Sequence, residues 1–264
     1  MKQSFSKAIY VLLFSSLLTF LCSAQNDYTV LKVYGTITYK KLDRELAKGD
    51  QFKDKDVLIF KTTESRAAVI SPEKGRLMIT KSNSNDASGM NFVPGLSNIS
   101  TRGGSINTLM DLENEFAGEY LLLNIAKINV GKTNFPQNEE SFFYIKYKYN
   151  NEEINKKLAF SGDTLIINVN ELLQVDGKPI QLGETSDMKL YYLKDKNSTL
   201  ICDFIAIFPD KKALLNEITI ILNTYTNKES KYLYNEIKSY ITEFYGKPND
   251  FDLRNWLKVN LNFE

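Results

Sequence analysis

Strand-like runs and helical periodicity occupy different parts of this 264-residue chain, and this separation constrains the fold more than any other feature. Short runs of β-branched, aromatic and aliphatic residues, separated by turn residues, fill most of residues 28–208. After Pro209 the apolar residues recur at i, i+3 and i+4, which predicts helices over about 210–225, 228–245 and 251–259. Strands followed by helices are typical of the α+β class.

The N-terminal part of the chain is expected to form a small module of its own. Residues 25–81 contain five or six short strand patterns with turn residues between them, which predicts a small β-barrel or sandwich. Residues 82–104 are rich in Ser, Asn and Gly and therefore predict a linker. Residues 90–95 inside this linker are more apolar, so we expect them to dock on a neighbouring element.

Residues 105–264 are expected to form a second, α+β domain. Ser105 is the expected N-cap of a helix that ends near Phe116. The three C-terminal helices then follow an antiparallel β-meander. Strands of this meander are expected at residues 119–130, 142–149, 154–160, 164–169, 188–193 and 200–208.

The first 24 residues have the organisation of a secretory signal peptide. Lys2 and Lys7 precede an apolar run over residues 8–21, and small residues follow up to Ala24. The apolar run is too short to span a bilayer comfortably as a permanent anchor. We therefore expect cleavage after Ala24 and a mature protein that begins at Gln25, in the periplasm or outside the cell.

Cys22 leaves a lipoprotein open as an alternative. A bacterial lipoprotein is cut just before a cysteine that then carries the lipid. That cut requires a small residue immediately upstream, and here the residue is Leu21. Cleavage after Ala24 is for this reason the favoured interpretation.

The charge balance gives no indication of a nucleic-acid or membrane-surface partner. Two of the 33 basic side chains and none of the 32 acidic ones lie in residues 1–24, so the mature chain has 31 basic and 32 acidic side chains. Its net charge is about −1, whereas domains that bind nucleic acid are clearly basic. We expect no nucleic-acid partner and no transmembrane segment in the mature chain.

The chain contains no histidine, and this absence removes the commonest chemistry of catalysis at neutral pH. Histidine is the usual general base, the partner of serine and cysteine nucleophiles, and the commonest zinc ligand. Cys202 is the one cysteine after residue 24, so an intramolecular disulfide is also excluded. Export without disulfides is more typical of bacterial envelope proteins than of small eukaryotic secreted domains. We expect no catalytic residue, no cofactor and no metal site.

Two short motifs have structural interpretations that are simpler than functional ones. Gly131 and Lys132 resemble the end of a phosphate-binding loop, but Ala126 stands where that motif requires a glycine. A turn that ends a strand is the favoured interpretation. Cys202 lies in an apolar strand whose alternation places Leu200 and Phe204 on its own face, which predicts a buried core cysteine.

Three pairs of carboxylates leave a hydrolase open. A glycosidase needs two acids about 5–10 Å apart in a cleft. Adjacent acids on a strand point to opposite faces of the sheet, so a solvated surface is the favoured interpretation. The third pair is also explained by a helix cap. The pairs are Glu139 and Glu140, Glu152 and Glu153, and Asp250 and Asp252.

One strand pattern predicts an interaction surface. Alternation over residues 142–149 places Phe142, Tyr144, Lys146 and Lys148 on one side of the predicted strand, with the other side in the core. The aromatic residues and lysines of the first side are suited to stacking on a glycan or to pairing with a partner strand. An ordinary sheet face whose lysines prevent edge-to-edge pairing is nevertheless the favoured interpretation.

The N-terminal module resembles the β-domain of FecR-type proteins in its order of turns and strands. This resemblance covers about 50 of the 264 residues and implies a periplasmic β-module. FecR regulators join a cytoplasmic segment to a transmembrane helix, and this chain has no counterpart of either. No catalytic residue belongs to the motif. The residues that carry the resemblance are Leu46, Gly49, Asp50, Phe52, Asp56, Leu58, Ser65, Ala67, Ala68, Val69 and Gly75.

Three hypotheses for the function follow. The first is an exported, non-enzymatic envelope protein that acts as a protein-interaction or accessory module, with another envelope protein as its partner. The second is a glycan-binding or cell-wall-binding protein that uses the exposed aromatic residues of the meander. The third is a carboxylate-based hydrolase.

Overall fold

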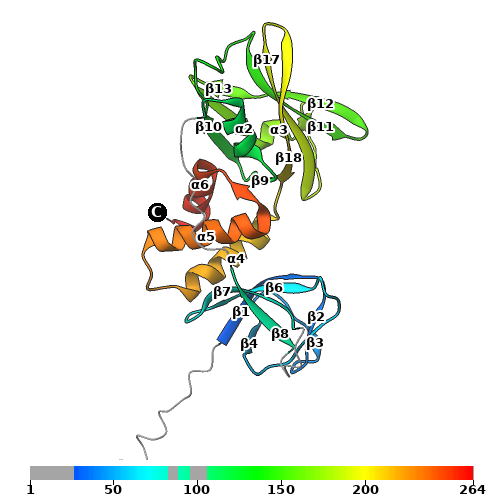
Figure 1. Cartoon of the computed structure of the whole chain (residues 1–264), viewed down its shortest axis with the longest axis vertical. Coiled ribbons are helices and arrows are strands. Elements are labelled where there is room, and N and C mark those ends of the chain that lie inside the picture. The colour runs from blue at the N-terminus through cyan, green and yellow to red at the C-terminus, as the bar shows by residue number, and fades with distance from the viewer. Residues whose placement is uncertain (1–26, 83–88, 96–105, 264) are drawn as a thin grey trace, which may run out of the picture. The chain divides into compact units, whose positions relative to one another are not determined.

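The computed structural model describes residues 27–82, 89–95 and 106–263, and the chain divides into two compact units between Val93 and Pro94 (Figure 1). Antiparallel sheets are present in both units, and the longest helices lie at the C-terminal end of the second. The predicted α+β class is therefore confirmed. The predicted signal peptide, residues 1–24, lies outside the described residues.

The first unit contains two antiparallel sheets. A five-stranded sheet has the order β4 (Gln51–Lys53), β1 (Asp27–Tyr34), β6 (Arg66–Ser71), β7 (Gly75–Lys81) and β8 (Met90–Pro94). A three-stranded sheet has the order β3 (Arg44–Glu45), β2 (Ile37–Tyr39) and β5 (Leu58–Phe60).

Both sheets of the first unit contribute to one apolar core. Tyr28 and Val69 enter it from the larger sheet, and Ile37 and Leu58 enter it from the smaller. Side chains stabilise the turns between the strands: Asp56 accepts hydrogen bonds from the hydroxyl of Tyr39 at 2.6 Å and from the backbone amide of Lys53 at 2.9 Å. These contacts explain why so short a set of strands keeps a fixed register.

The predicted linker, residues 82–104, contains a strand. Strand β8 adds to the edge of the five-stranded sheet, and Met90 is buried in its core. The expectation that residues 90–95 dock on a neighbouring element agrees with this pairing. Residues 90–94 therefore belong to that sheet rather than to a linker, because apolar side chains in a polar segment find a sheet edge.

The second unit is built around a six-stranded sheet with the order β12, β11, β17, β18, β9 and β19 (Figure 1). A three-stranded sheet, β10–β14–β13, shares a core with it, and β15 pairs with β16 in a small hairpin. The bounds of these strands are β9 (Glu119–Leu121), β10 (Ile125–Asn129), β11 (Phe142–Tyr149), β12 (Glu152–Lys157), β13 (Ala159–Ser161), β14 (Thr164–Asn168), β15 (Gln174–Val175), β16 (Lys178–Pro179), β17 (Thr185–Lys194), β18 (Asn197–Ile207) and β19 (Lys247–Pro248).

The meander differs from the expected one in three respects. The predicted strand 119–130 is two strands, β9 and β10, which belong to different sheets. The predicted strand 154–160 is likewise divided between β12 and β13. Strand β9 pairs in parallel with both β18 and β19, so the sheet is not antiparallel throughout. Each difference reflects a long-range pairing that local alternation does not encode.

Five helices complete the described part of the second unit. Helix α2 (Leu109–Phe116) is capped by Thr108 in a capping box with Asp111, so its N-cap is not Ser105 as expected. Helix α3 (Val169–Leu172) is a single turn. The bounds of the last three are α4 (Lys211–Thr224), α5 (Ser230–Tyr245) and α6 (Asp250–Leu261), within two residues of the prediction.

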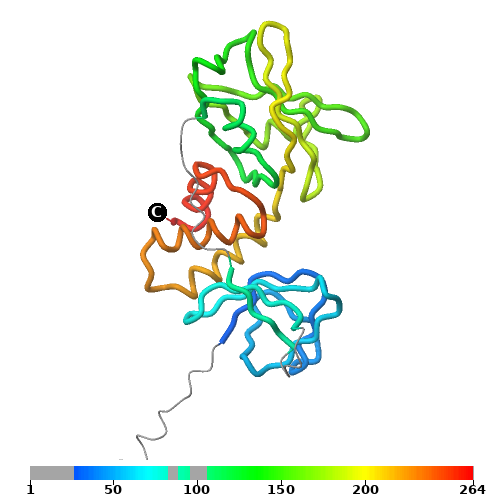
Figure 2. The backbone as a smooth tube through the Cα atoms, viewed as in Figure 1, coloured from blue at the N-terminus to red at the C-terminus, as the bar shows by residue number. Residues whose placement is uncertain are grey.

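The C-terminal helices bury one face each. Asp210 caps α4 by accepting hydrogen bonds from the amides of Lys212 and Ala213, and Gly246 ends α5 with a φ of 83°. Figure 2 traces the chain from α4 through a short turn into α5 and on to α6. The apolar residues of these helices with the lowest exposure are Leu214, Ile218, Ile221, Ile237, Tyr240, Ile241, Leu253 and Leu257. Within the described ranges, no helix combines the length and apolarity needed to cross a bilayer.

Candidate functional site

The alternation predicted for residues 142–149 is present in β11. Phe143 and Ile145 are fully buried, and Tyr147 is 2% exposed, so this side of the strand is core. The side chains of Phe142, Tyr144, Lys146 and Lys148 lie on the opposite side of the strand and are partly or fully exposed. The four residues predicted as an interaction surface are therefore neighbours on one sheet face.

Neighbouring strands extend this surface, which we call the open sheet face. In the registers of β11 with β12 and β17, Tyr144 lies between Lys157 and Tyr191, and Lys146 lies between Asn155 and Lys189. Leu200 and Ile205 of β18 are 44% and 37% exposed. The open sheet face comprises Phe142, Tyr144, Lys146, Lys148, Glu153, Asn155, Lys157, Asp187, Lys189, Tyr191, Leu193, Leu200, Asp203 and Ile205.

Strand β11 is an interior strand of the sheet. Strand β12 occupies one of its edges and β17 the other. The ordinary-face interpretation is therefore wrong only in its edge protection, and pairing of a partner strand with β11 itself is wrong as well. A partner of this surface must contact side chains rather than the β11 backbone.

Aromatic rings form one half of the open sheet face. Tyr144 and Tyr191 stack with centroids 5.0 Å apart and an interplanar angle of 10°, and Phe142 meets Tyr144 edge-on at 6.5 Å. Ammonium groups lie near two of the rings, with Lys157 4.4 Å from the centroid of Phe142 and Lys146 5.5 Å from that of Tyr191. Neighbouring side chains thus already contact ring faces, and the Tyr144 hydroxyl bonds to the Ser198 hydroxyl at 2.5 Å, so it is the ring edges that remain for a partner.

Charged residues surround a hollow in the other half of the open sheet face. The hollow has a volume of about 820 Å³, and the exposed Ile205 lies in its lining. Its charged lining consists of Lys146, Lys148, Glu153, Asp187, Lys189 and Asp203. Charges of both signs around apolar atoms are typical of a surface that contacts protein.

Four of these charged residues already form ion pairs with one another. Lys146 contacts Glu153 at 3.3 Å, and Lys189 contacts Asp203 at 3.5 Å. The hydrogen bond to Glu153 raises the pKa of Lys146, so this ammonium group stays charged at neutral pH.

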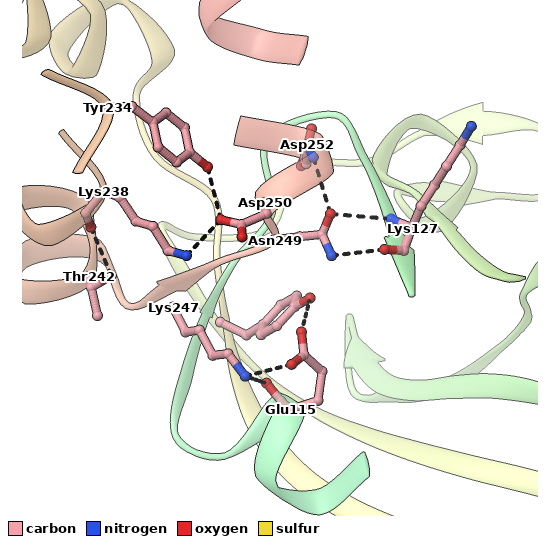
Figure 3. Close-up of polar contacts among 10 residues, drawn as sticks. Glu115, Lys127, Tyr234, Lys238, Thr242, Lys247, Asn249, Asp250 and Asp252 are labelled. Carbon is pink, nitrogen blue, oxygen red and sulfur yellow. Dashed lines mark hydrogen bonds and ion pairs between the residues drawn. The ribbon is translucent and has the colours of Figure 1, made fainter. Parts of the chain in front are cut away.

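A second polar cluster, which we call the α6 clamp, lies where α6 meets the segment between β9 and β10 (Figure 3). Asp252 is 2% exposed, and its carboxylate accepts hydrogen bonds from the backbone amides of Leu123, Asn124 and Ile125 at 2.9–3.1 Å. These amides belong to the segment that divides the predicted strand 119–130. Asp252 thus explains why the strand breaks there.

Asn249 holds the neighbouring strand in a similar way. Its side-chain amide donates a hydrogen bond to the backbone carbonyl of Lys127 at 3.0 Å and accepts one from the backbone amide of Lys127 at 3.4 Å (Figure 3). The same side chain caps α6 by accepting a hydrogen bond from the backbone amide of Asp252. The side chain imitates a paired strand and satisfies backbone groups of β10.

Asp250 makes the third polar contact of the α6 clamp. It receives hydrogen bonds from Lys238 at 2.7 Å and from Tyr234 at 2.9 Å, and both donors come from α5 (Figure 3). Partial burial alone would raise the pKa of Asp250, but the bonds from Lys238 and Tyr234 outweigh it and hold the pKa below its usual value. Burial and the Asp250 carboxylate together raise the pKa of Tyr234.

Lys247 and Glu115 form a further link near the α6 clamp. The ammonium of Lys247 contacts the Glu115 carboxylate at 2.6 Å and the Glu115 backbone carbonyl at 2.9 Å, at the C-terminal end of α2 (Figure 3). A cation at this position complements the helix dipole and satisfies a terminal carbonyl.

The acids predicted as possible catalytic pairs do not act together. Asp250 and Asp252 are engaged by different elements, namely the side chains of α5 and the backbone before β10. Glu153 bonds to Lys146 and Glu139 bonds to Lys157 across the sheet surface. Glu140 and Glu152 are exposed, and the other four carboxylates bond to separate partners, so these pairs do not form a cleft with two opposed acids.

Cys202 is half-buried against the core of the second unit. Burial, together with the nearby Asp203, raises the pKa of its thiol to about 12. Leu200 was expected on the same face, but it is exposed on the other, because a bulge between Leu190 and Tyr191 shifts the register of β18.

Gly131 begins a turn after the bridge at Val130, and its carbonyl accepts hydrogen bonds from the amides of Asn134 and Phe135. The structure thus agrees with the turn interpretation of the phosphate-loop-like motif.

A buried acid was missed in the sequence analysis. Glu217 lies on the buried face of α4 at 3% exposure, where Tyr240 and Tyr245 donate to it at 2.9 and 2.6 Å. The sequence signal for its burial is its position on the apolar face of the predicted helix, one residue before Ile218. The contacts join α4 to α5 and identify Glu217 as a structural group.

Among the described residues, no group of three or more acids and cysteines is placed to hold a metal ion. The chain matches no protein-family model, no curated protein and no solved structure. What these residues define is an α+β protein with one open sheet face and an internally satisfied polar clamp.

Proposed function

We propose that this chain is an exported, non-enzymatic protein of the bacterial envelope that acts as a protein-interaction or accessory module through the open sheet face. The observation that supports it is the grouping of partly exposed aromatic rings, two exposed aliphatic side chains and a hollow with mixed charges on one side of a single sheet. Aromatic contact area with a polar surround is characteristic of protein interfaces.

Glycan binding is the second candidate function. It is favoured by the partly exposed aromatic residues Phe142 and Tyr144, which lie on the same sheet face as the hollow. It is ranked lower because a sugar stacks on a ring face, and faces of Tyr144 and Tyr191 are turned toward each other in their stack. A carboxylate-based hydrolase ranks last, because Asp250 and Asp252 are held by separate partners and the other two pairs lie in exposed positions.

We also propose that the first unit is a FecR-like β-module whose two sheets pack as a sandwich. Support comes from the common core of the two sheets and from the turns at Gly49 and Asp56, where the resemblance lies. No catalytic role is assigned to this unit.

The interaction role is tested by photo-cross-linking in intact cells. A photoreactive phenylalanine analogue replaces Tyr144 in one variant and Tyr232 in a matched variant, because Tyr232 is also exposed, at 42%, but lies on α5. We expect a discrete protein adduct from position 144 that is absent from position 232. Equal adducts from both positions, or none from position 144, would contradict the proposal.

The glycan alternative is tested by retention of the purified protein on peptidoglycan. Retention that is lost in Tyr144→Ala and kept in Tyr232→Ala would favour glycan binding over protein binding. We expect neither variant to differ from the parent protein.

Export is tested by cell fractionation and N-terminal sequencing. We expect the protein in the envelope fraction with Gln25 as its first residue. Unprocessed full-length protein in the cytosol would contradict this part of the proposal, and a lipid-modified Cys22 would establish the lipoprotein alternative.

A further inference from the structure

Strand β18 is paired on both sides only in its last part. Along one side it pairs with β17 from Asn197 to Ile207. Along the other side, β9 is its one partner among the described strands, and β9 reaches only Ile205–Ile207. Residues 197–200, which we call the β18 edge, are all exposed. The β18 edge therefore borders the open sheet face, to which Leu200 belongs, at a place where the sheet has room for another strand.

The backbone of the β18 edge presents unused hydrogen-bonding groups. A two-residue turn with φ of 50° and 64° joins β17 to β18, so Lys194 and Asn197 are the hydrogen-bonded pair that closes the hairpin. Bonded pairs alternate along an antiparallel ladder, so the amides and carbonyls of Ser198 and Leu200 point away from β17. Among the residues that the structure describes, none bonds to these two amides and two carbonyls. The bulge in β18 follows Leu200, so the register of the β18 edge is regular.

Two other strand edges of the second unit are protected, and the β18 edge is not. Four of the six residues of β12, at one end of the same sheet, are charged, which disfavours pairing with another strand. Backbone groups of β10 are satisfied by Asn249 and Asp252 of the α6 clamp. In contrast, residues 197–202 of β18 carry no charged side chain. The β18 edge is thus suited to pairing with an added strand.

A pocket lies beside the β18 edge. It has a volume of about 500 Å³, and its lining includes Thr199 of β18 and Leu109 of α2. Leu109 is 47% exposed, and Leu200 is exposed on the opposite face of the strand from Thr199. Successive side chains of an added strand also point to opposite faces, so one set meets the pocket and the other meets the open sheet face. Both sets find an exposed leucine.

We infer that the β18 edge binds an extended peptide segment of a partner protein, which adds to the six-stranded sheet as a strand beside β18. A polypeptide backbone is the ligand whose donors and acceptors match the spacing of the free groups on Ser198 and Leu200. Contacts with Leu109 and Leu200 favour a short apolar run in that peptide. This inference rests on the proposed function, since it gives the protein partner a chemical form and a binding mode.

A direct test selects peptides that bind the β18 edge. A phage-displayed library of random heptapeptides is panned on the purified protein, and a selected peptide is synthesised with a fluorophore. Fluorescence anisotropy then measures its dissociation constant. We expect the selected peptides to contain an apolar run, because consecutive side chains meet Leu109 and Leu200 on opposite faces.

The variant Leu200→Pro blocks the β18 edge and keeps its pairing with β17. Proline removes only the amide of residue 200, which points outward, and its ring stands where the peptide approaches. We expect peptide binding that is about tenfold weaker, because a backbone hydrogen bond is lost on top of the steric hindrance. A peptide that binds Leu200→Pro as tightly as the parent protein would overturn the inference.

The matched control is Gln51→Pro in β4, an edge strand of the first unit. Val30 bonds to the carbonyl of Asp50 across β1 and β4, so by alternation the amide of Gln51 points outward as well. This variant also places a proline at an exposed edge, and it should bind the peptide as the parent protein does. Circular dichroism checks that both variants are folded.

Two further measurements need no change in the protein. In a series of peptides that each carry one N-methylated residue, binding should be weakened about tenfold at every second position, because an added strand bonds to β18 through alternate amides. In the complex, hydrogen exchange of the amides of Ser198 and Leu200 should slow, whereas that of Gln51 should not change. Methylation effects without alternation, or unchanged exchange at both β18 amides, would overturn strand addition.

The outcomes also separate this inference from the proposed function. A cross-linked adduct at position 144, without any peptide from the library that binds at the β18 edge, would overturn strand addition and leave the interaction role intact. Neither an adduct nor such a peptide would overturn both. A peptide weakened by Leu200→Pro, without an adduct at position 144, would support strand addition and overturn the open sheet face as the contact surface.

Discussion

The open sheet face and the α6 clamp contain similar residue types in opposite environments. Both combine acids, lysines and tyrosines, but Asp203 on the sheet face has a side chain 65% exposed, whereas Asp252 in the clamp is 2% exposed. The ion pairs of the sheet face lie on neighbouring strands, such as Lys189 with Asp203. The clamp joins residues more than 120 positions apart.

Polar groups that are buried stabilise the molecule, whereas polar groups that are exposed are available to a partner. A buried carboxylate that satisfies backbone amides cannot be removed without leaving those amides unpaired. Exposed pairs exchange readily with water and contribute little to stability. The clamp therefore holds the second unit together, while the sheet face is free to vary in its contacts.

The largest expected effect is that of Asp252→Ala. The substitution leaves the amides of Leu123, Asn124 and Ile125 without their acceptor in a buried site, so we expect a loss of about 3–5 kcal/mol in the free energy of unfolding. Trp256, on the same helix and 2% exposed, provides the fluorescence signal for urea unfolding.

The matched control for this prediction is Asp187→Ala on the open sheet face. Asp187 is exposed, so its removal should change the free energy of unfolding by less than about 0.5 kcal/mol. Equal effects of the two substitutions would remove the distinction between the two regions.

The sequence pattern predicted those elements that are determined by residues close together along the chain. The alternation of β11 placed Phe143 and Ile145 in the core, and the helical period after Pro209 predicted α4, which Asp210 caps. Both depend on neighbours within a few residues along the chain. The same holds for the four sheet-face residues predicted as a surface, whose exposed side follows from the period of two.

Long-range contacts account for what local patterns missed. The break after Leu121 depends on Asp252, which lies far away in the sequence. The exposure of Leu200 depends on a bulge in the pairing of β18 with β17. Neither a clamp nor a register shift leaves a periodic signal in a single sequence, so the site beyond β11 was not predictable.

The second largest effect concerns the pH dependence of the α6 clamp. The pKa of Asp250 is lowered from its ordinary value of 3.8, so the charged form is favoured in the folded state. The resulting stabilisation is fully present above the ordinary pKa and is lost as the pH falls through the lower pKa of the folded state. We expect Asp250→Asn to remove about 1 kcal/mol of stability at pH 7 and much less below pH of about 3.

Urea unfolding at several pH values, followed by Trp256 fluorescence, measures this dependence. The difference between the parent protein and Asp250→Asn should shrink as the pH is lowered. A difference that stays constant, or grows, on acidification would show that the bonds from Lys238 and Tyr234 do not depend on the charge of Asp250.

A smaller effect is expected from the ring stack on the open sheet face. A double-mutant cycle with Tyr144→Ala and Tyr191→Ala should give a coupling of about 0.5–1.5 kcal/mol, because the rings stack at 5.0 Å. Tyr144 with Tyr232 is the control pair, since these residues lie on different elements, and its coupling should be zero.

The smallest effect is expected at the pair of Glu139 with Lys157. The two side chains approach to 2.7 Å, a shorter distance than several contacts of the α6 clamp, yet they are 88% and 41% exposed. If distance alone decided stability, Glu139→Gln would be as harmful as a change in the clamp. Because water replaces the lost contact on both partners, we expect a change below about 0.5 kcal/mol that decreases further at high salt. A loss comparable to that of Asp250→Asn in urea unfolding would mean that exposure does not separate the two regions, and the contrast between them would have to rest on geometry instead.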